Sequence, residues 1–250
     1  MSTSLSKRYN NLLKDGMDRY QHAVEAKSPQ NIIKHAQASI STLIQAMDLA
    51  KVVNMEQRIP YINEYLVLNN TLIGSALFEE KDLVGAIEQY KKSLELNKKT
   101  LNNQETHIRR LFIWQKLMSI ARVQENIRLA EDFAENIFFV VKTKLKDIAR
   151  SLEYLNLIKD IFIQSKNLDM INKTYALLLR RCKKATQPEL RKAKADTYRN
   201  YAKYATLVLQ KKRVGTKYFH RAKNLYTELS ASDEIALMEQ ELSQDLGLKK

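Results

Sequence analysis

Glycine and proline are scarce in this chain of 250 residues, which contains five glycines and three prolines. Average usage is about 7% for glycine and about 5% for proline, so both are well under-represented. Tight turns depend on these residues, and β-sheets depend on tight turns. Their scarcity therefore argues against a sheet protein and favours long helices with few interruptions.

Cysteine and long apolar runs are also rare. Cys182 is the only cysteine, which excludes an internal disulfide and fits a reducing compartment. The longest notable apolar run, residues 137–141, is far shorter than the ~18 residues of a membrane span. Residues 1–10 lack the apolar core of a signal peptide. These absences predict a cytoplasmic protein.

The residues that usually carry catalysis are scattered. Of the four histidines, no two lie within one helical turn, and no metal site is expected from such spacing. The five glycines are isolated, so no glycine-rich loop could hold a phosphate or a dinucleotide. The acidic pairs Glu79–Glu80 and Glu239/Glu241 are interpreted as solvated side chains. The sequence therefore predicts neither an enzyme nor a bound cofactor.

Positive charge is abundant and localised. The formal net charge is +14, and residues 142–221 alone carry +15, against +2 for residues 1–141 and −3 for residues 222–250. A concentration of this kind can attract nucleic acid, anionic lipid or an acidic protein. The alternative interpretation is a solvated outer face of lysine-rich helices that serves solubility.

Nine cations in that segment are candidates for contact with an anionic partner, because they cluster or recur at helical spacing. Like charges at i, i+4 repel by a few tenths of a kcal/mol, a small cost that a bound anion would remove. A turn near Asp147 would divide the first three from one another. The candidates are Lys142, Lys146, Arg150, Arg180, Arg181, Lys184, Lys192, Arg199 and Lys203.

Two further features of the basic segment have competing interpretations. The tract 198–204 interleaves tyrosines with cations, as single-stranded nucleic-acid binders do, but its residues also fall on one wide helical face that packing alone would bury. Cys182 has four flanking cations, which would favour a reactive thiolate. It also lies four residues after Leu178, on the apolar face of its helix. We favour a packing role for both.

Helical periodicity runs nearly from end to end, and its interruptions are short. Ser28, Asp82 and Asn167 are predicted N-caps. Pro60 predicts a helix start or a kink, and Pro188 predicts another helix start. A closing helix is expected over residues 232–246, with Ser232 as its cap and two acids in its first turn.

One segment carries a recognisable hairpin signature. Gly74, Leu77, Ala86, Tyr90 and Ser93 follow the order and spacing of a tetratricopeptide-type hairpin, in which small residues let two helices approach and an aromatic fills the space beside them. A second copy opens with a Trp-x2-Leu pattern at residues 114–117. The clearest repeats are thus 70–98 and 111–140, and weaker copies cover 20–43, 155–178 and 202–225.

The repeat is longer than the standard one. Equivalent second-helix positions recur every 41 to 50 residues, whereas the standard repeat has 34; they are Ala36, Ala86, Ala130, Ile171 and Tyr218. The chain resembles the divergent, long-helix members of the tetratricopeptide-repeat-like superfamily, such as the soluble NSF attachment proteins and related adaptors. The resemblance implies a right-handed solenoid of stacked hairpins that holds other molecules.

We therefore predict an all-α, right-handed solenoid of about five antiparallel hairpins with the capping helix 232–246, in a single domain over residues 1–250. The expected function is that of a non-enzymatic adaptor or scaffold. It would bind an acidic peptide or helix of a partner protein in a concave groove lined by the first helices of the hairpins. Two alternatives are a nucleic-acid-binding protein that uses residues 142–221, and a peripheral membrane-trafficking adaptor whose basic face meets anionic lipid. The sequence does not indicate an oligomeric state.

Overall fold

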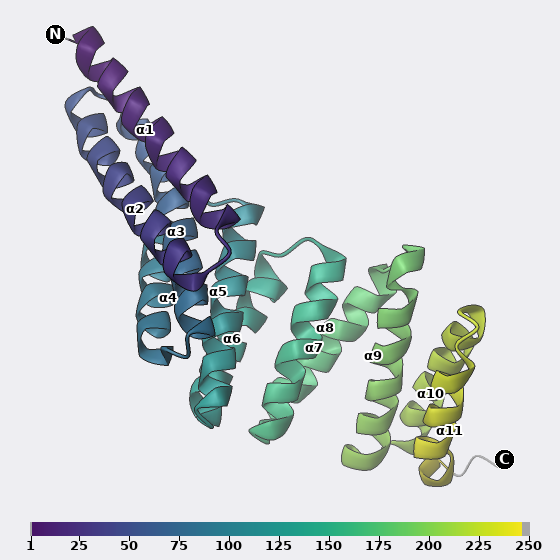
Figure 1. The fold of residues 1–250 in the computed structure, drawn as a ribbon. Helices are drawn as coiled ribbons and strands as arrows, with labels where there is room; N and C mark the ends of the chain where they lie inside the picture. The colour runs from purple at the N-terminus through teal and green to yellow at the C-terminus, as the bar shows by residue number, and fades with distance from the viewer. Residues whose placement is uncertain (1, 247–250) are drawn as a thin grey trace. The chain divides into compact units, whose positions relative to one another are not determined.

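The computed structural model describes residues 2–246, without the side chains of residues 2, 3 and 243–245. Within that range it contains eleven α-helices, two short 3-10 helices and one π-helical segment, and no strand (Figure 1). No helix in the same range combines the length and apolar character needed to cross a membrane. The predicted all-α class is confirmed.

The helices follow one another with short connections. The first six are α1 (Ser2–Glu25), α2 (Pro29–Val52), α3 (Ile59–Glu79), α4 (Leu83–Asn97), α5 (Gln104–Val123) and α6 (Ile127–Thr143). The other five are α7 (Ile148–Gln164), α8 (Leu168–Lys184), α9 (Arg191–Lys203), α10 (Lys212–Glu228) and α11 (Ser232–Leu246). The 3-10 helices are η1 (Glu56–Arg58) and η2 (Pro188–Leu190), and the π-helical segment is η3 (Tyr204–Val208).

Consecutive helices pack as hairpins: α1 against α2, α3 against α4, α7 against α8, and α9 against α10. This confirms the predicted hairpin architecture. The chain divides into two compact units, unit 1 (Met1–Phe133) and unit 2 (Ala134–Lys250), whose boundary falls inside α6. The single domain over residues 1–250 and the handedness of the solenoid stay predictions.

Most of the helix ends lie where the sequence placed them. The side chains of Ser28, Asp82 and Asn167 accept hydrogen bonds from backbone N–H groups three residues ahead, as N-caps do. Pro60 lies in the first turn of α3, and Pro188 opens η2, which leads into α9. Ser232 is a correction: it is the first helical residue of α11, because the carbonyl of Ala231 already accepts the hydrogen bond from Ile235.

The core of unit 1 contains the predicted close approach between α3 and α4. A Cβ atom placed on Gly74 would lie 3.0–3.2 Å from three ring atoms of Tyr90. Tyr90 is fully buried, and its hydroxyl lies 3.0 Å from the Oγ of Ser75. Any larger residue at position 74 would therefore require the aromatic ring that fills the hairpin to shift by a few tenths of an ångström. Trp114 is only partly buried and packs against the same apolar cluster.

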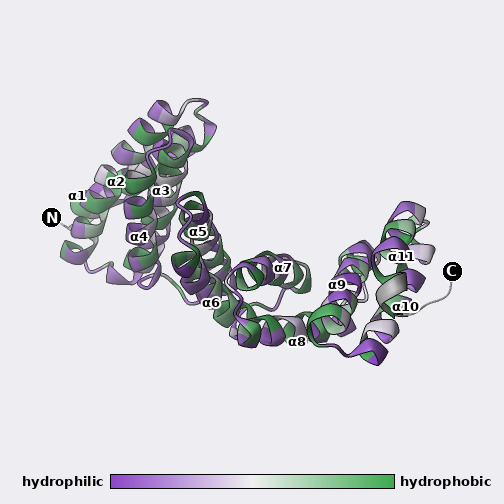
Figure 2. Cartoon of the chain, turned by 90° about the horizontal axis from the view of Figure 1, so that it is seen from below, coloured by the Kyte–Doolittle hydropathy of each residue, from purple (hydrophilic) through white to green (hydrophobic). Residues whose placement is uncertain are grey.

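The core of unit 2 combines aliphatic and tyrosine side chains. Leu155 and Phe162 of α7 and Leu178 of α8 are fully buried. Between α9 and α10 the rings of Tyr198 and Tyr218 lie 5.4 Å apart, and Tyr198 is almost fully buried. The tyrosine tract therefore packs in the interior, as the sequence favoured. Figure 2 shows apolar and polar residues alternating around the helices, as expected of helices that are buried on some faces.

Candidate anion-binding pocket

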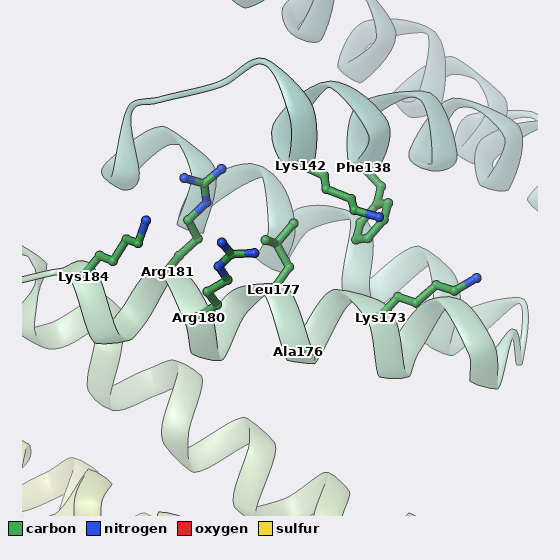
Figure 3. Close-up of a pocket in the computed structure, with 8 residues that line it drawn as sticks. All are labelled: Phe138, Lys142, Lys173, Ala176, Leu177, Arg180, Arg181 and Lys184. Carbon is green, nitrogen blue, oxygen red and sulfur yellow. The ribbon is translucent and has the colours of Figure 1, made fainter.

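Five cations of unit 2 surround one pocket between α6 and α8 (Figure 3). Its volume is about 410 Å³, within the range of about 300–1,000 Å³ that is usual for ligand pockets. No acidic residue is among those that line it, which are Phe138, Lys142, Lys173, Ala176, Leu177, Arg180, Arg181 and Lys184. Four of the nine predicted cations therefore meet here.

Helical spacing explains why these side chains converge. On α8 the cations follow one stripe, since Lys173, Arg180 and Lys184 lie seven and four residues apart and project from the same side of the helix. On α6, Phe138 and Lys142 are four residues apart and face α8. Figure 3 shows side chains from both helices extending into the space between them.

Arg181 fixes the two helices together. Its Nη2 donates hydrogen bonds to the carbonyls of Val141 and Leu145, at 2.9 and 3.0 Å, where α6 ends. The last carbonyls of a helix have no donors within it, so this guanidinium supplies what the helix end lacks. Burial lowers the pKa of Arg181, and the neighbouring charge of Arg180 lowers it further. We assign Arg181 a positioning role.

The cations around Arg181 are more accessible. Lys142, Arg180 and Lys184 are all exposed, and none of the three forms an ion pair with an acid among the side chains that the structure describes. The Lys142 ammonium lies 6.0 Å from the ring centroid of Phe138, whereas Lys173 is paired with Asp169. Three exposed cations without an acidic partner thus face one pocket.

The remaining predicted cations lie elsewhere. Lys146 is in the loop between α6 and α7, and Arg150 is in the first turn of α7, with its Nε 3.7 Å from Asp147. The turn at Asp147 separates both from Lys142, as the sequence suggested. Lys142, Lys146 and Arg150 therefore do not form one helical stripe.

Three predicted cations form ion pairs with α11. Lys192 pairs with Glu234 at 2.5 Å, while Arg199 and Lys203 pair with Glu241 at 2.6 and 3.1 Å. The hydrogen bond to Glu234 raises the pKa of Lys192. These pairs give the three cations a structural role in docking α11. The acidic residues of the C-terminal segment could have indicated these ion pairs from the sequence. That this segment packs back towards α9 was not predicted.

The pocket also differs in place from the expected groove. The sequence predicts a ligand groove lined by the first helices of the hairpins, whereas this pocket is lined by α6 and by α8, the second helix of its hairpin with α7. Lys173, seven residues before Arg180, was overlooked although the same spacing could have found it. The apolar wall of Phe138 and Leu177 was missed as well.

Other potentially reactive groups do not join the pocket. Cys182 is fully buried, and burial raises the pKa of its thiol to about 11, although a hydrogen bond with Thr197 and the charge of Lys194 act in the opposite direction. The rings of His22 and His35 lie 5.9 Å apart across the first hairpin. In the part of the chain that the structure describes, no group of three or more histidine, cysteine or acidic side chains could hold a metal ion.

Comparisons with known proteins do not show a family for this chain. No protein-family model matches the chain. No curated protein matches it. Among solved structures, a de novo designed helical repeat protein is similar to it, with 16% sequence identity over 94% of this chain and 100% of that chain, and a TM-score of 0.21. At that score the similarity carries no argument about architecture or function, which rest on the geometry above.

Proposed function

We propose that this protein is a non-enzymatic interaction protein whose unit 2 binds an acidic segment of a partner protein in the pocket between α6 and α8. The observation that carries the proposal is the set of five cations around a pocket without a lining acid, three of them with no acidic partner in the described region. Carboxylates in the pocket would relieve the mutual repulsion of Lys142, Arg180 and Lys184.

Charge alone would not hold such a partner. Exposed ion pairs contribute about 0.2–1 kcal/mol each, so three of them fall far short of the ~8 kcal/mol that micromolar affinity requires. The apolar wall formed by Phe138, Ala176 and Leu177 supplies a second contribution, because it can cover an apolar side chain beside the acids. The expected ligand therefore combines acidic residues with at least one apolar residue.

The geometry favours an acidic protein segment over nucleic acid. Single-stranded nucleic acid is bound by exposed aromatic rings along a basic track, but Tyr198 and Tyr204 are buried, and Arg199 is paired with Glu241. Three accessible cations, Lys142, Arg180 and Lys184, are gathered at one compact pocket instead. Nucleic acid and anionic membrane remain the alternatives that the test below separates.

Fluorescence anisotropy can test the proposal with a labelled glutamate-rich peptide that has a central leucine. The triple variant Lys142→Gln, Arg180→Gln, Lys184→Gln should bind this peptide at least about tenfold more weakly than the unmodified protein. A matched control is Lys212→Gln, Arg213→Gln, Lys217→Gln, which removes the same charge from exposed positions of α10. The control should change the affinity by less than about twofold, because its residues lie outside the pocket.

Two outcomes would contradict the proposal. If the control weakens binding as much as the pocket variant, only net charge matters and the pocket has no special role. If labelled single-stranded DNA or anionic vesicles bind more tightly than the peptide, and lose that binding in the pocket variant, the corresponding alternative replaces the proposal. A steep dependence on salt concentration would accompany nucleic-acid binding.

A further inference from the structure

A second concave surface of unit 2 is apolar, and it lies on the other side of α8 from the basic pocket. Ile171 and Tyr175 of α8 line it, whereas Lys173 and Leu177 line the basic pocket. Residues two apart in a helix project about 200° from each other, so the two sites use opposite faces of the same helix. The second surface encloses about 390 Å³. We call it the α7–η3 groove.

Four large apolar side chains around this groove are exposed to solvent. Ile163 is 45% exposed, Leu168 55%, Leu207 52% and Val208 51%. Ile163 and Leu168 flank the turn between α7 and α8, whereas Leu207 and Val208 belong to η3, which is distant in the sequence. Single exposed apolar residues are ordinary, but a gathering of them around one groove marks a surface that another molecule covers.

The π-helical geometry of η3 explains why two of these four apolar side chains are exposed. The backbone N–H of Leu209 donates to the carbonyl of Tyr204, five residues back, at 3.1 Å. The widened turn buries Tyr204, Ala205 and Thr206 together and leaves the next two residues, Leu207 and Val208, exposed. Such π-turns are rare in proteins overall, and many of those that occur lie at functional sites. The backbone therefore presents these side chains instead of burying them.

The rim of the groove is predominantly basic. Lys166 is exposed at the turn between α7 and α8, whereas Lys203, beside η3, is already paired with Glu241 of α11. The single acid on the rim, Asp160, lies 3.3 Å from the ammonium of Lys159. Because the rim has an excess of positive charge, a complementary ligand would be apolar on one side and acidic at its edges.

The chain itself contains a helix of that kind, docked nearby. In α11, Met238 and Leu242 are fully buried, while Glu239 and Glu241 pair with Lys223 and Arg199. An acidic amphipathic helix is thus already held by unit 2 through apolar contacts in the middle and ion pairs at the edges. The α7–η3 groove offers a similar combination of an apolar floor and a lysine, Lys166, at its edge, without an occupant from the described residues.

We propose that the α7–η3 groove docks an acidic amphipathic helix of a partner protein. Apolar side chains of that helix lie against Leu168, Leu207 and Val208, and its acids face Lys166. This site goes beyond the function proposed above, because it uses the opposite face of α8 and depends mainly on apolar burial. An experiment can therefore disprove one of the two proposed sites without affecting the other.

The experiment uses a labelled synthetic helix with leucines at i, i+3, i+4 and i+7 and glutamates on its other face. Leu207→Asp should weaken binding of this peptide by at least about tenfold in the full-length protein, and Leu168→Asp should do the same. Val84→Asp is the matched control, because Val84 is also an exposed aliphatic residue, at 76%, but lies on α4 in unit 1. A scrambled peptide of the same composition should not bind, since its leucines no longer share a face. Circular dichroism verifies that each variant stays folded.

Several results would overturn this proposal. Equal binding of the scrambled peptide would show that charge alone is responsible, and unchanged binding in Leu207→Asp would place the peptide elsewhere. If analytical ultracentrifugation shows that the protein self-associates and that Leu207→Asp abolishes the self-association, the groove binds a second copy of the chain instead. The Lys142, Arg180, Lys184 triple variant should bind the helical peptide almost normally. A loss there, with Leu207→Asp unaffected, would assign the peptide to the basic pocket.

Discussion

Neighbouring residues on one turn of α8 have opposite roles. Arg181 is anchored to the carbonyls of Val141 and Leu145, whereas Arg180 points into the basic pocket and is exposed. An arginine can donate to two carbonyls at a helix end through its planar guanidinium, which a lysine reproduces poorly. The anchored residue thus fixes the direction in which its neighbours project, and the neighbours are left free for a ligand.

Gly74 provides the sharpest test at the residue scale. Gly74→Ala would ordinarily stabilise a helix by about 0.5–1 kcal/mol, but here the new Cβ would lie 3.0 Å from the Tyr90 ring. Overpacking costs about 1–3 kcal/mol, so we expect a net loss in the free energy of unfolding, measured by urea denaturation. The double variant Gly74→Ala, Tyr90→Leu should lose less than the sum of the two single changes. A more stable Gly74→Ala protein would show that the ring moves aside freely.

At this scale, local patterns were predictable and distant partners were not. The caps at Ser28 and Asp82 and the Gly74–Tyr90 contact follow from spacing within one helix or one hairpin. The pairing of Arg199 with Glu241 joins residues 42 positions apart. Which cations Glu239 and Glu241 meet depends on how α11 packs against the helices before it, and no spacing rule encodes that.

The regular helices and the π-helical segment η3 differ in how well the sequence predicts them. Regular helices follow from the 3.6-residue period, but the π-turn of η3 shifts the hydrogen bonds from i+4 to i+5 within one continuous helical pattern. Its sequence, from Tyr204 to Val208, reads as ordinary helix. The α7–η3 groove was therefore not predicted, although most of its lining residues are apolar or basic.

The docking of α11 depends on the protonation of Glu241. Burial opposes ionisation, but the hydrogen bonds from Arg199 and Lys203 outweigh it and hold the pKa of Glu241 below its usual range. A depressed pKa stabilises the fold above about pH 4.3, the value in an unfolded chain, and this stabilisation disappears as the pH falls through the folded pKa.

Glu241→Gln should therefore cost about 1 kcal/mol at neutral pH, a value that allows for the partial exposure of the pair. Thermal denaturation of the two proteins, followed by circular dichroism, should show a Tm difference that closes as the pH is lowered towards 3. Glu239→Gln, which breaks a more exposed pair with Lys223, should have a smaller effect at every pH. A Tm difference that persists in acid would assign the loss to packing and not to charge.

On the scale of the whole molecule, charge is divided unequally between the two units. From the sequence, unit 2 carries a net +11 and unit 1 a net +3. Composition alone revealed this asymmetry. It did not reveal that α11 neutralises part of the basic segment while the pocket between α6 and α8 stays open. Part of the excess charge that remains lies at the proposed ligand site, where it would also speed the approach of an acidic partner.

Contacts in this molecule are mostly between consecutive helices, which has a consequence for how it unfolds. In a chain of hairpins, each hairpin is stabilised by its own core and by its neighbours, so a local defect should loosen one region first.

Phe162 is fully buried on α7, and Phe162→Ala should cost about 3–5 kcal/mol. Hydrogen exchange measured by mass spectrometry should then accelerate in α7 and α8 and stay unchanged in α2, α3 and α4. Tyr90→Ala, in the core of unit 1, should produce the converse pattern and leave α9 and α10 protected. Equal acceleration of every helix in both variants would show that the two units unfold as one cooperative body.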